Sequence, residues 1–143
     1  MDNHSVDLFN SNPDSQFISQ LNKATLNLLW FSEAEYPFHI IYWKNLRHFD
    51  ELTLLHQSGY SSETKVAIQE FDSFFDSVTR KEAWHNEEEQ AEVERYQTLV
   101  DLLATNLTDT KVYLLGEVEI DVYILGKTEH KAIAGLTTKI VST

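Results

Sequence analysis

The stretch "KVYLLGEVEIDVYILGKTEHKAIAGLTTKIVST", residues 111–143, carries the strongest signal for the fold. It is rich in aliphatic and β-branched residues and contains Gly116, Gly126 and Gly135, a pattern that predicts three strand segments in a meander. Between residues 117 and 122 acidic and aliphatic side chains alternate, so the acids share one strand face and the aliphatic groups share the other. The C-terminal part of the chain therefore predicts a sheet.

Two earlier segments are predicted to add strands. "FHIIYWK", residues 38–44, has apolar side chains at both odd and even positions, which is typical of a strand that is covered on both faces. "TKVAIQEF", residues 64–71, is predicted to be a second strand. Because the first of these strands is apolar on both sides, we expect helices on both sides of the sheet.

The remaining periodic segments are predicted helices: residues 13–29, 48–57, 72–78 and about 86–107. Gly59 is expected to end the second helix and Asp72 to cap the third. Together these elements predict an α+β fold, an α-β-α sandwich with a mixed, largely antiparallel central sheet. We expect one domain over residues 13–143, after a disordered lead at residues 1–12.

The charge of the chain limits its partners. Among 143 residues, 11 are Lys or Arg and 23 are Asp or Glu, which gives a net charge of −12. Nucleic-acid binding relies on cationic groups, so direct binding of DNA or RNA is disfavoured, whereas a basic protein would be attracted. The alternative is that the carboxylates only keep the protein soluble. The polar first residues and the lack of a long apolar run predict a cytoplasmic protein without membrane contact.

The best candidate for catalysis is the acidic row Glu117, Glu119 and Asp121, since carboxylates can bind Mg²⁺ or Ca²⁺. Alternate residues of a strand lie about 6.6 Å apart, so three of them do not converge on one ion without further ligands. The alternative interpretation is a polar strand face, or salt bridges to Lys127 and Lys139. The chain has no Cys, no glycine-rich phosphate loop and no nucleophile motif, which points away from an enzyme.

Three further features stand out. The stretch "LLWFSEAEYPF", residues 28–38, is predicted to end a helix, cross an acidic loop and enter a strand, with Glu33 and Glu35 between large aromatic groups. Trp84 lies in a polar segment and is either a lid on the core, the simpler expectation, or an interface anchor. Thr143 combines a hydroxyl with the terminal carboxylate, and both are oxygen ligands that suit Mg²⁺.

The chain resembles the cyanobacterial nuclease A inhibitors, which block a sugar-nonspecific, metal-dependent nuclease. The resemblance rests on "LLWFSEAEYPF", on "DSFF" with the tryptophan and acidic run that follow, on "VYLLGEVEIDVYILGKT" and on the terminal "AGLTTKIVST". These blocks occur in the same order from about residue 15 to the last residue.

The resemblance implies a 1:1 inhibitor with no cofactor of its own that plugs the substrate entrance of the nuclease. By that resemblance Glu33 stands in for the substrate phosphate and meets arginines, Trp84 packs at the same contact, and Thr143 reaches the catalytic Mg²⁺ of the nuclease. Glu35 is expected to accompany Glu33 in the acidic loop. The loop would then carry carboxylates because it imitates an anionic substrate.

Three positions depart from the family pattern: Ala83, Ser142 and His39 each stand where an acid is expected. Glu82 is a candidate to substitute for the acid lost at position 83. Two other functions stay open. One is a metal-dependent phosphoester hydrolase that uses the acidic row at residues 117–121, and the other is an acidic nucleic-acid mimic for another basic protein.

Overall fold

The structure is a computed structural model that describes residues 12–44, 46 and 48–142. The expected disordered lead lies outside this range except for Asn12, which is buried. The Asn12 side chain accepts hydrogen bonds from the Asp14 amide at 2.8 Å and from the Tyr42 hydroxyl at 2.9 Å.

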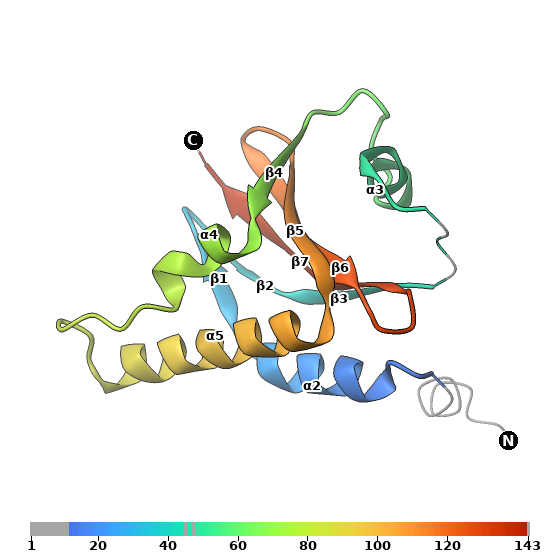
Figure 1. Cartoon of the computed structure of the whole chain (residues 1–143). Coiled ribbons are helices and arrows are strands. Elements are labelled where there is room, and N and C mark those ends of the chain that lie inside the picture. The colour runs from blue at the N-terminus through green and yellow to red at the C-terminus, as the bar shows by residue number, and fades with distance from the viewer. Residues whose placement is uncertain (1–11, 45, 47, 143) are drawn as a thin grey trace, which may run out of the picture.

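The centre of the domain is a five-stranded sheet in the order β3-β7-β6-β5-β4 (Figure 1). Its strands are β3 (His39–Trp43), β4 (Val66–Glu70), β5 (Thr108–Leu115), β6 (Glu119–Lys127) and β7 (Ile133–Val141). The predicted meander is confirmed as β5, β6 and β7, and the two earlier strands pair at its edges. Every described strand pair of this sheet is antiparallel. The short turns of the meander require this direction for β5, β6 and β7, and the two edge strands pair in the same way.

Both faces of this sheet are apolar, as the pattern of residues 38–44 predicts. Alternate residues of β5 contribute to opposite sides: Val112 packs in the larger core cluster, and Tyr113 and Leu115 pack in the smaller one. In β3, Ile40 packs against the larger cluster and Ile41 against the smaller. Successive strand side chains point to opposite faces, so this segregation follows from the sequence alternation.

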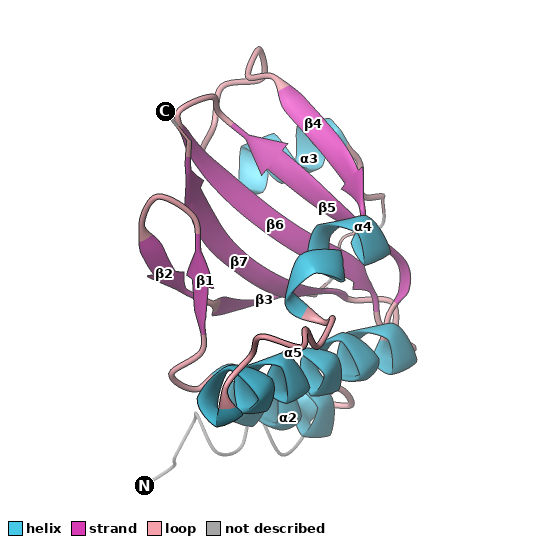
Figure 2. Ribbon diagram, turned by 90° about the vertical axis from the view of Figure 1, so that its left-hand side faces the viewer, coloured by secondary structure: helices cyan, strands magenta, loops and turns pink. Residues whose placement is uncertain are grey.

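Helices cover both faces, which confirms the α-β-α sandwich. The larger cluster lies under α2 (Ser15–Thr25), α4 (Phe71–Phe75) and α5 (Glu87–Asn106), while α3 (Glu51–Gln57) covers the smaller one. Figure 2 shows α3 behind the sheet, α4 in front of it, and α2 and α5 together at one end. A short 3₁₀ helix, η1 (Asp76–Val78), continues α4. Among the described residues, no helix combines the length and the apolar character that a membrane crossing requires.

The first helix is shorter than predicted. It ends at Thr25, and Asn27 then adopts a left-handed conformation with φ 61°. The prediction that the helix continues to Leu29 is wrong, because Leu29–Phe31 forms strand β1, which pairs with β2 (Glu35–Pro37). A strand places the Trp30 side chain inside an aromatic cluster, and burial of this large ring stabilises the strand relative to a longer helix.

Among the other helices, one predicted N-cap differs from the structure. The N-cap of α4 is Glu70, and Asp72 lies in the first turn, so the predicted cap at Asp72 is wrong by two residues. The long helix is confirmed, and Asn86 and Glu89 form a capping box at its start. Gly59 follows the end of α3 with φ 80°, as expected for a glycine after a helix.

Candidate functional site

The acidic loop is the turn of a two-stranded hairpin. Residues 32–34 join β1 to β2, and Phe31 is paired directly with Glu35. Trp30 points inward and is buried, whereas Phe31 is 56% exposed, since neighbouring strand side chains point to opposite faces. Directly paired residues share a face, so Phe31 and Glu35 project together from the outer side of the hairpin.

The turn is fastened to the end of the central sheet. The Val141 amide donates to the Oγ of Ser32 at 3.0 Å, and the Glu33 amide donates to the Val141 carbonyl at 3.3 Å. Within the turn, the Ser32 amide donates to the Ala34 carbonyl at 2.9 Å. These bonds place Glu33 beside the C-terminal end of β7, and Figure 2 shows the hairpin next to that end of the chain.

Beneath the hairpin, Trp30 anchors it in an aromatic cluster. Its ring stacks on Phe74 with centroids 4.4 Å apart and planes 11° apart. It also meets three other rings edge-on, those of Phe38, Phe75 and Tyr96. The Tyr96 hydroxyl donates to the Leu29 carbonyl at 2.5 Å, which ties α5 to β1. Because interiors are close-packed, the cluster fixes the direction in which the turn projects.

Trp84 is not a lid on the core. Its side chain is 72% exposed, so the simpler expectation from the sequence is wrong and the residue is available to a partner. The Trp84 ring meets the His85 ring edge-on with centroids 4.2 Å apart. The Glu82 amide donates to Nδ1 of His85 at 2.9 Å, and the His85 amide donates to the Glu82 carbonyl at 3.1 Å. The exposed tryptophan thus sits on a loop that has its own internal bonds.

A shallow hollow of about 180 Å³ connects the hairpin with this loop. Its walls come from β1, η1, the loop 79–86 and the first turns of α5, namely Phe31, Ser77, Val78, His85, Glu89, Glu92, Val93 and Tyr96. Burial is the main cause that raises the pKa of Tyr96, and the negative charge of Glu92 adds to it. Glu92 and Tyr96 both line the hollow, so a carboxylate and a buried phenol lie in the same wall region.

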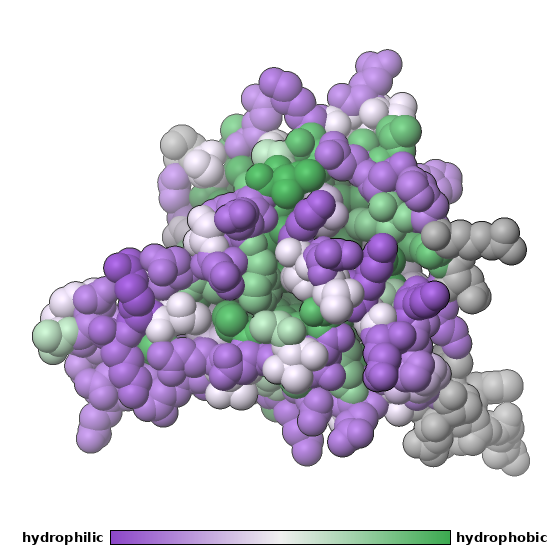
Figure 3. All heavy atoms as spheres, in the orientation of Figure 1, coloured by the Kyte–Doolittle hydropathy of each residue, from purple (hydrophilic) through white to green (hydrophobic). Residues whose placement is uncertain are grey.

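We name this region the acidic–aromatic surface. It consists of Phe31, Glu33, Glu35, Glu82, Trp84, His85, Glu89 and Glu92. The basic residues nearest in the sequence form ion pairs with acids outside this surface: Arg80 pairs with Asp76 at 3.5 Å, and Lys81 pairs with Glu94 at 2.7 Å. Figure 3 shows that hydrophilic side chains cover most of the projecting end formed by the loop 79–86 and the start of α5.

The predicted site residues fall into two groups. Glu33 and Glu35 lie on the hairpin, and Glu82 and Trp84 lie on the loop 79–86, joined by the hollow that Phe31 and His85 share. Thr143 lies outside the described residues. The amide of its neighbour Ser142 donates to the Val118 carbonyl at 2.9 Å, so the last described residue is hydrogen-bonded to the rest of the domain.

The acidic row of β6 does not form a common site. Glu117 precedes the strand, while Glu119 and Asp121 lie 3.8 and 3.9 Å from Nζ of Lys139. Asp121 also accepts a hydrogen bond from the hydroxyl of Tyr60. Within the described part of the chain, no three His, Asp or Glu side chains are grouped so that they could hold a metal ion. The salt-bridge interpretation is confirmed for Lys139.

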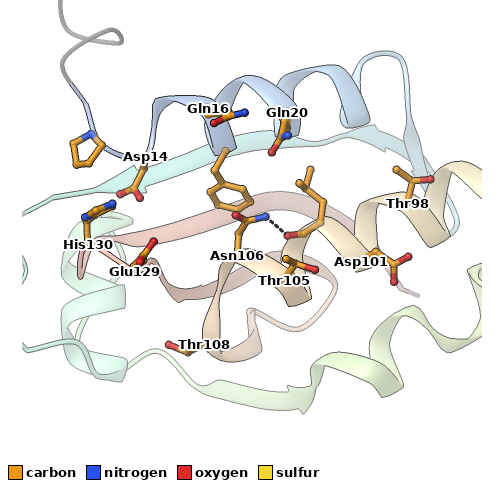
Figure 4. A pocket seen from close by; sticks show the side chains of 13 residues that line it. Asp14, Gln16, Gln20, Thr98, Asp101, Thr105, Asn106, Thr108, Glu129 and His130 are labelled. Atoms are coloured by element: carbon orange, nitrogen blue, oxygen red, sulfur yellow. Dashed lines mark hydrogen bonds between the residues drawn. The ribbon is translucent and has the colours of Figure 1, made fainter.

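A larger hollow, of about 870 Å³, lies between α2 and the second half of α5 (Figure 4). Its polar groups serve the fold. Asp14 accepts hydrogen bonds from the hydroxyls of Tyr42 at 2.8 Å and Thr128 at 3.0 Å, and the Asn106 side chain donates to the Leu102 carbonyl at 2.9 Å. This hollow lies along the C-terminal half of α5, whereas the hollow of the acidic–aromatic surface lies along its N-terminal half.

Sequence reasoning missed four members of the surface: Phe31, His85, Glu89 and Glu92. The signal for Phe31 is present in "LWF", residues 29–31, because a strand assignment there exposes every second side chain. His85 carries no such signal, since its role depends on the bond to the Glu82 amide.

Fold and surface together define an acidic α+β domain that presents charged and aromatic groups on one exposed side. A family model described as "Nuclease A inhibitor-like protein" matches residues 15–143. The chain therefore belongs to the nuclease A inhibitor-like family, as its sequence resemblance predicts. The comparison with curated proteins gave no match.

Proposed function

We propose that this protein is a cytoplasmic inhibitor that forms a 1:1 complex with a sugar-nonspecific, metal-dependent nuclease. The observation that carries the proposal is the attachment of the hairpin turn to the end of β7. It brings Glu33 beside Val141, close to the last residue that the structure describes. The family match supports a nuclease as the partner.

In the proposed complex the acidic–aromatic surface closes the substrate entrance. A nuclease binds an anionic backbone with cationic side chains, and a carboxylate can pair with arginine in the bidentate way that phosphate does. Glu33 takes the place of a substrate phosphate, and Glu35 and Glu82 extend the anionic surface. Trp84 supplies apolar contact area that is exposed in the isolated protein.

Thr143 is proposed to approach the catalytic Mg²⁺ of the nuclease. Its hydroxyl and terminal carboxylate are hard oxygen donors of the kind that Mg²⁺ prefers. The protein itself needs no metal for this role, and the inhibition involves no chemistry by this chain. The departure from the family pattern at Ala83 is proposed to adapt the surface to a nuclease with fewer arginines at that point.

The test is a titration of untagged protein into a Mg²⁺-dependent nuclease that digests both DNA and RNA. We expect both activities to disappear at a molar ratio near one. Trp84→Ala should raise the Kd about 30-fold or more, the effect of losing roughly 2 kcal/mol at a hot spot. Glu33→Ala should raise it about 10-fold to 100-fold, because the bonds of a buried charged group are stronger than neutral ones.

Matched controls lie outside the acidic–aromatic surface, on the helix α3 and in the loop that follows it. Leu52 on α3 is 60% exposed and Glu63 is exposed in the loop before β4, so Leu52→Ala and Glu63→Ala remove similar groups away from the surface. Both should inhibit like the unchanged protein. Residues added after Thr143 should weaken inhibition, whereas the same residues before Met1 should not. Unchanged inhibition by the double variant Glu33→Ala, Trp84→Ala would reject the proposed surface.

If no such nuclease is inhibited, the acidic surface must serve another basic protein. Capture experiments at low and high salt address that outcome, because a general nucleic-acid mimic would bind many partners and lose them as salt screens the charges.

A further inference from the structure

The hollow between Phe31 and α5 combines apolar walls with negative charge. Phe31, Val78 and Val93 supply apolar surface, while Glu89 and Glu92 bring two carboxylates to the same opening. Glu89 already accepts a hydrogen bond from the Asn86 amide at 2.8 Å, as part of the capping box. Glu92 forms no ion pair with any other residue that the structure describes.

We propose that this hollow receives one arginine side chain of the partner nuclease, a proposal that rests on the function proposed above. The volume of about 180 Å³ is smaller than the roughly 300–1,000 Å³ of sites for small-molecule ligands, but it accommodates a long side chain. Glu92 is the carboxylate that pairs with the guanidinium group, and the exposed ring of Phe31 packs against its plane.

Arginine fits this site better than lysine. The guanidinium group is planar, stacks on aromatic rings and pairs with a carboxylate through two parallel hydrogen bonds, whereas an ammonium group is a compact and strongly hydrated charge. An acidic or neutral partner side chain would meet the carboxylates of Glu89 and Glu92 and be repelled or left unpaired. The net charge of −12 likewise favours a basic partner over an acidic one.

The test compares Glu92→Gln with Asp101→Asn. Both changes remove one negative charge from α5 and keep the shape of the side chain. Asp101 lies nine residues further on, about 13.5 Å along the helix and on its opposite face, so long-range attraction changes equally in both variants. We expect Glu92→Gln to raise the Kd for the nuclease at least about tenfold and Asp101→Asn to change it less than about twofold.

A second measurement examines the hollow without the nuclease. N-acetyl-arginine amide is titrated into the isotopically labelled protein, with N-acetyl-norleucine amide as an uncharged probe of similar length. We expect saturable NMR shifts of the Val78 and Val93 methyl groups and the Tyr96 ring with the arginine probe only, and their loss in Glu92→Gln.

The two measurements separate the proposals. Full inhibition by the unchanged protein together with equal Kd values for Glu92→Gln and Asp101→Asn would overturn the arginine site and leave the proposed function intact. Absence of inhibition by the unchanged protein would overturn the proposed function and the nuclease as source of the arginine. In that case, shifts with the arginine probe would retain the hollow as an arginine site, and their absence would remove it.

Discussion

Ser32 offers the sharpest test of how the surface is built. Its Oγ accepts the Val141 amide at 3.0 Å and donates to the Ala34 carbonyl at 3.3 Å, so one hydroxyl links the hairpin turn to the end of β7. Ser32→Ala removes both bonds and leaves the Glu33 amide bonded to Val141 as the remaining link at this point. The change touches no group that is proposed to meet the partner.

The expected magnitudes follow from these two bonds. Each neutral hydrogen bond contributes about 0.5–1.5 kcal/mol, and both lie in exposed surroundings where water can replace the hydroxyl. We therefore expect the free energy of unfolding to fall by about 1 kcal/mol or less, because the Trp30 cluster still holds the hairpin. The Kd for the nuclease should rise about 5-fold to 10-fold, since a partner must order the loosened turn again.

Three measurements check this reasoning: chemical denaturation, inhibition titration and amide hydrogen exchange. Exchange of the Val141 and Glu33 amides should become faster in Ser32→Ala, while Ser32→Thr, which keeps a hydroxyl, should restore slow exchange and tight inhibition. Ser62→Ala, in an exposed turn after α3, is the matched control and should leave all three measurements unchanged. If Ser32→Ala inhibits as tightly as the unchanged protein while these amides exchange faster, the attachment does not position Glu33 for binding.

Three further outcomes are expected. Asn86→Ala breaks the capping box and should lower the free energy of unfolding by about 1 kcal/mol, measured by denaturation against the unchanged protein. Burial and the bond to Asp14 raise the pKa of Tyr42 from 10.0 to about 12, so the folded state keeps this proton longer. Stability from Tyr42 is therefore complete below pH 10 and lost as the pH rises toward 12, and Tyr42→Phe should show a smaller alkaline loss. Asp121→Asn removes the half-buried pair with Lys139 but keeps a side-chain oxygen that can accept from Tyr60, so it should cost about 1 kcal/mol with inhibition unchanged. A metal-dependent phosphoesterase activity abolished by this change would instead support the hydrolase alternative.

Long periodic segments made most of the fold predictable. The meander and the long helix each contain many residues that repeat one pattern, so single exceptions do not change the interpretation. The hairpin was missed because each of its strands has only three residues. Leu28 and Leu29 also fit the spacing of the preceding helix, and only residues 26–28, with the left-handed Asn27 at their centre, separate the two elements.

The candidate site was predictable only in part. The sequence predicts Glu33 and Glu35 as carboxylates of an acidic loop, and the structure has both exposed on the hairpin. The exposure of Trp84, in contrast, depends on where the loop 79–86 leaves the core. The bond between Ser32 and Val141 joins residues that are 109 positions apart. No local pattern signals such a contact, because it exists only after the hairpin and the sheet have both formed.

Two different properties of this protein set the expected affinity of its complex: its long-range charge and the order of its binding surface. The net charge of −12 acts at long range, so it governs the rate of encounter and its dependence on salt. The Trp30 cluster, the Ser32 bond and the capping box at Asn86 order the hairpin and the loop before any partner arrives, which lowers the entropy lost on binding. Neutralising a remote acid such as Asp101 should therefore slow association, whereas loosening Ser32 should speed dissociation, because order within the interface governs how long the complex lasts.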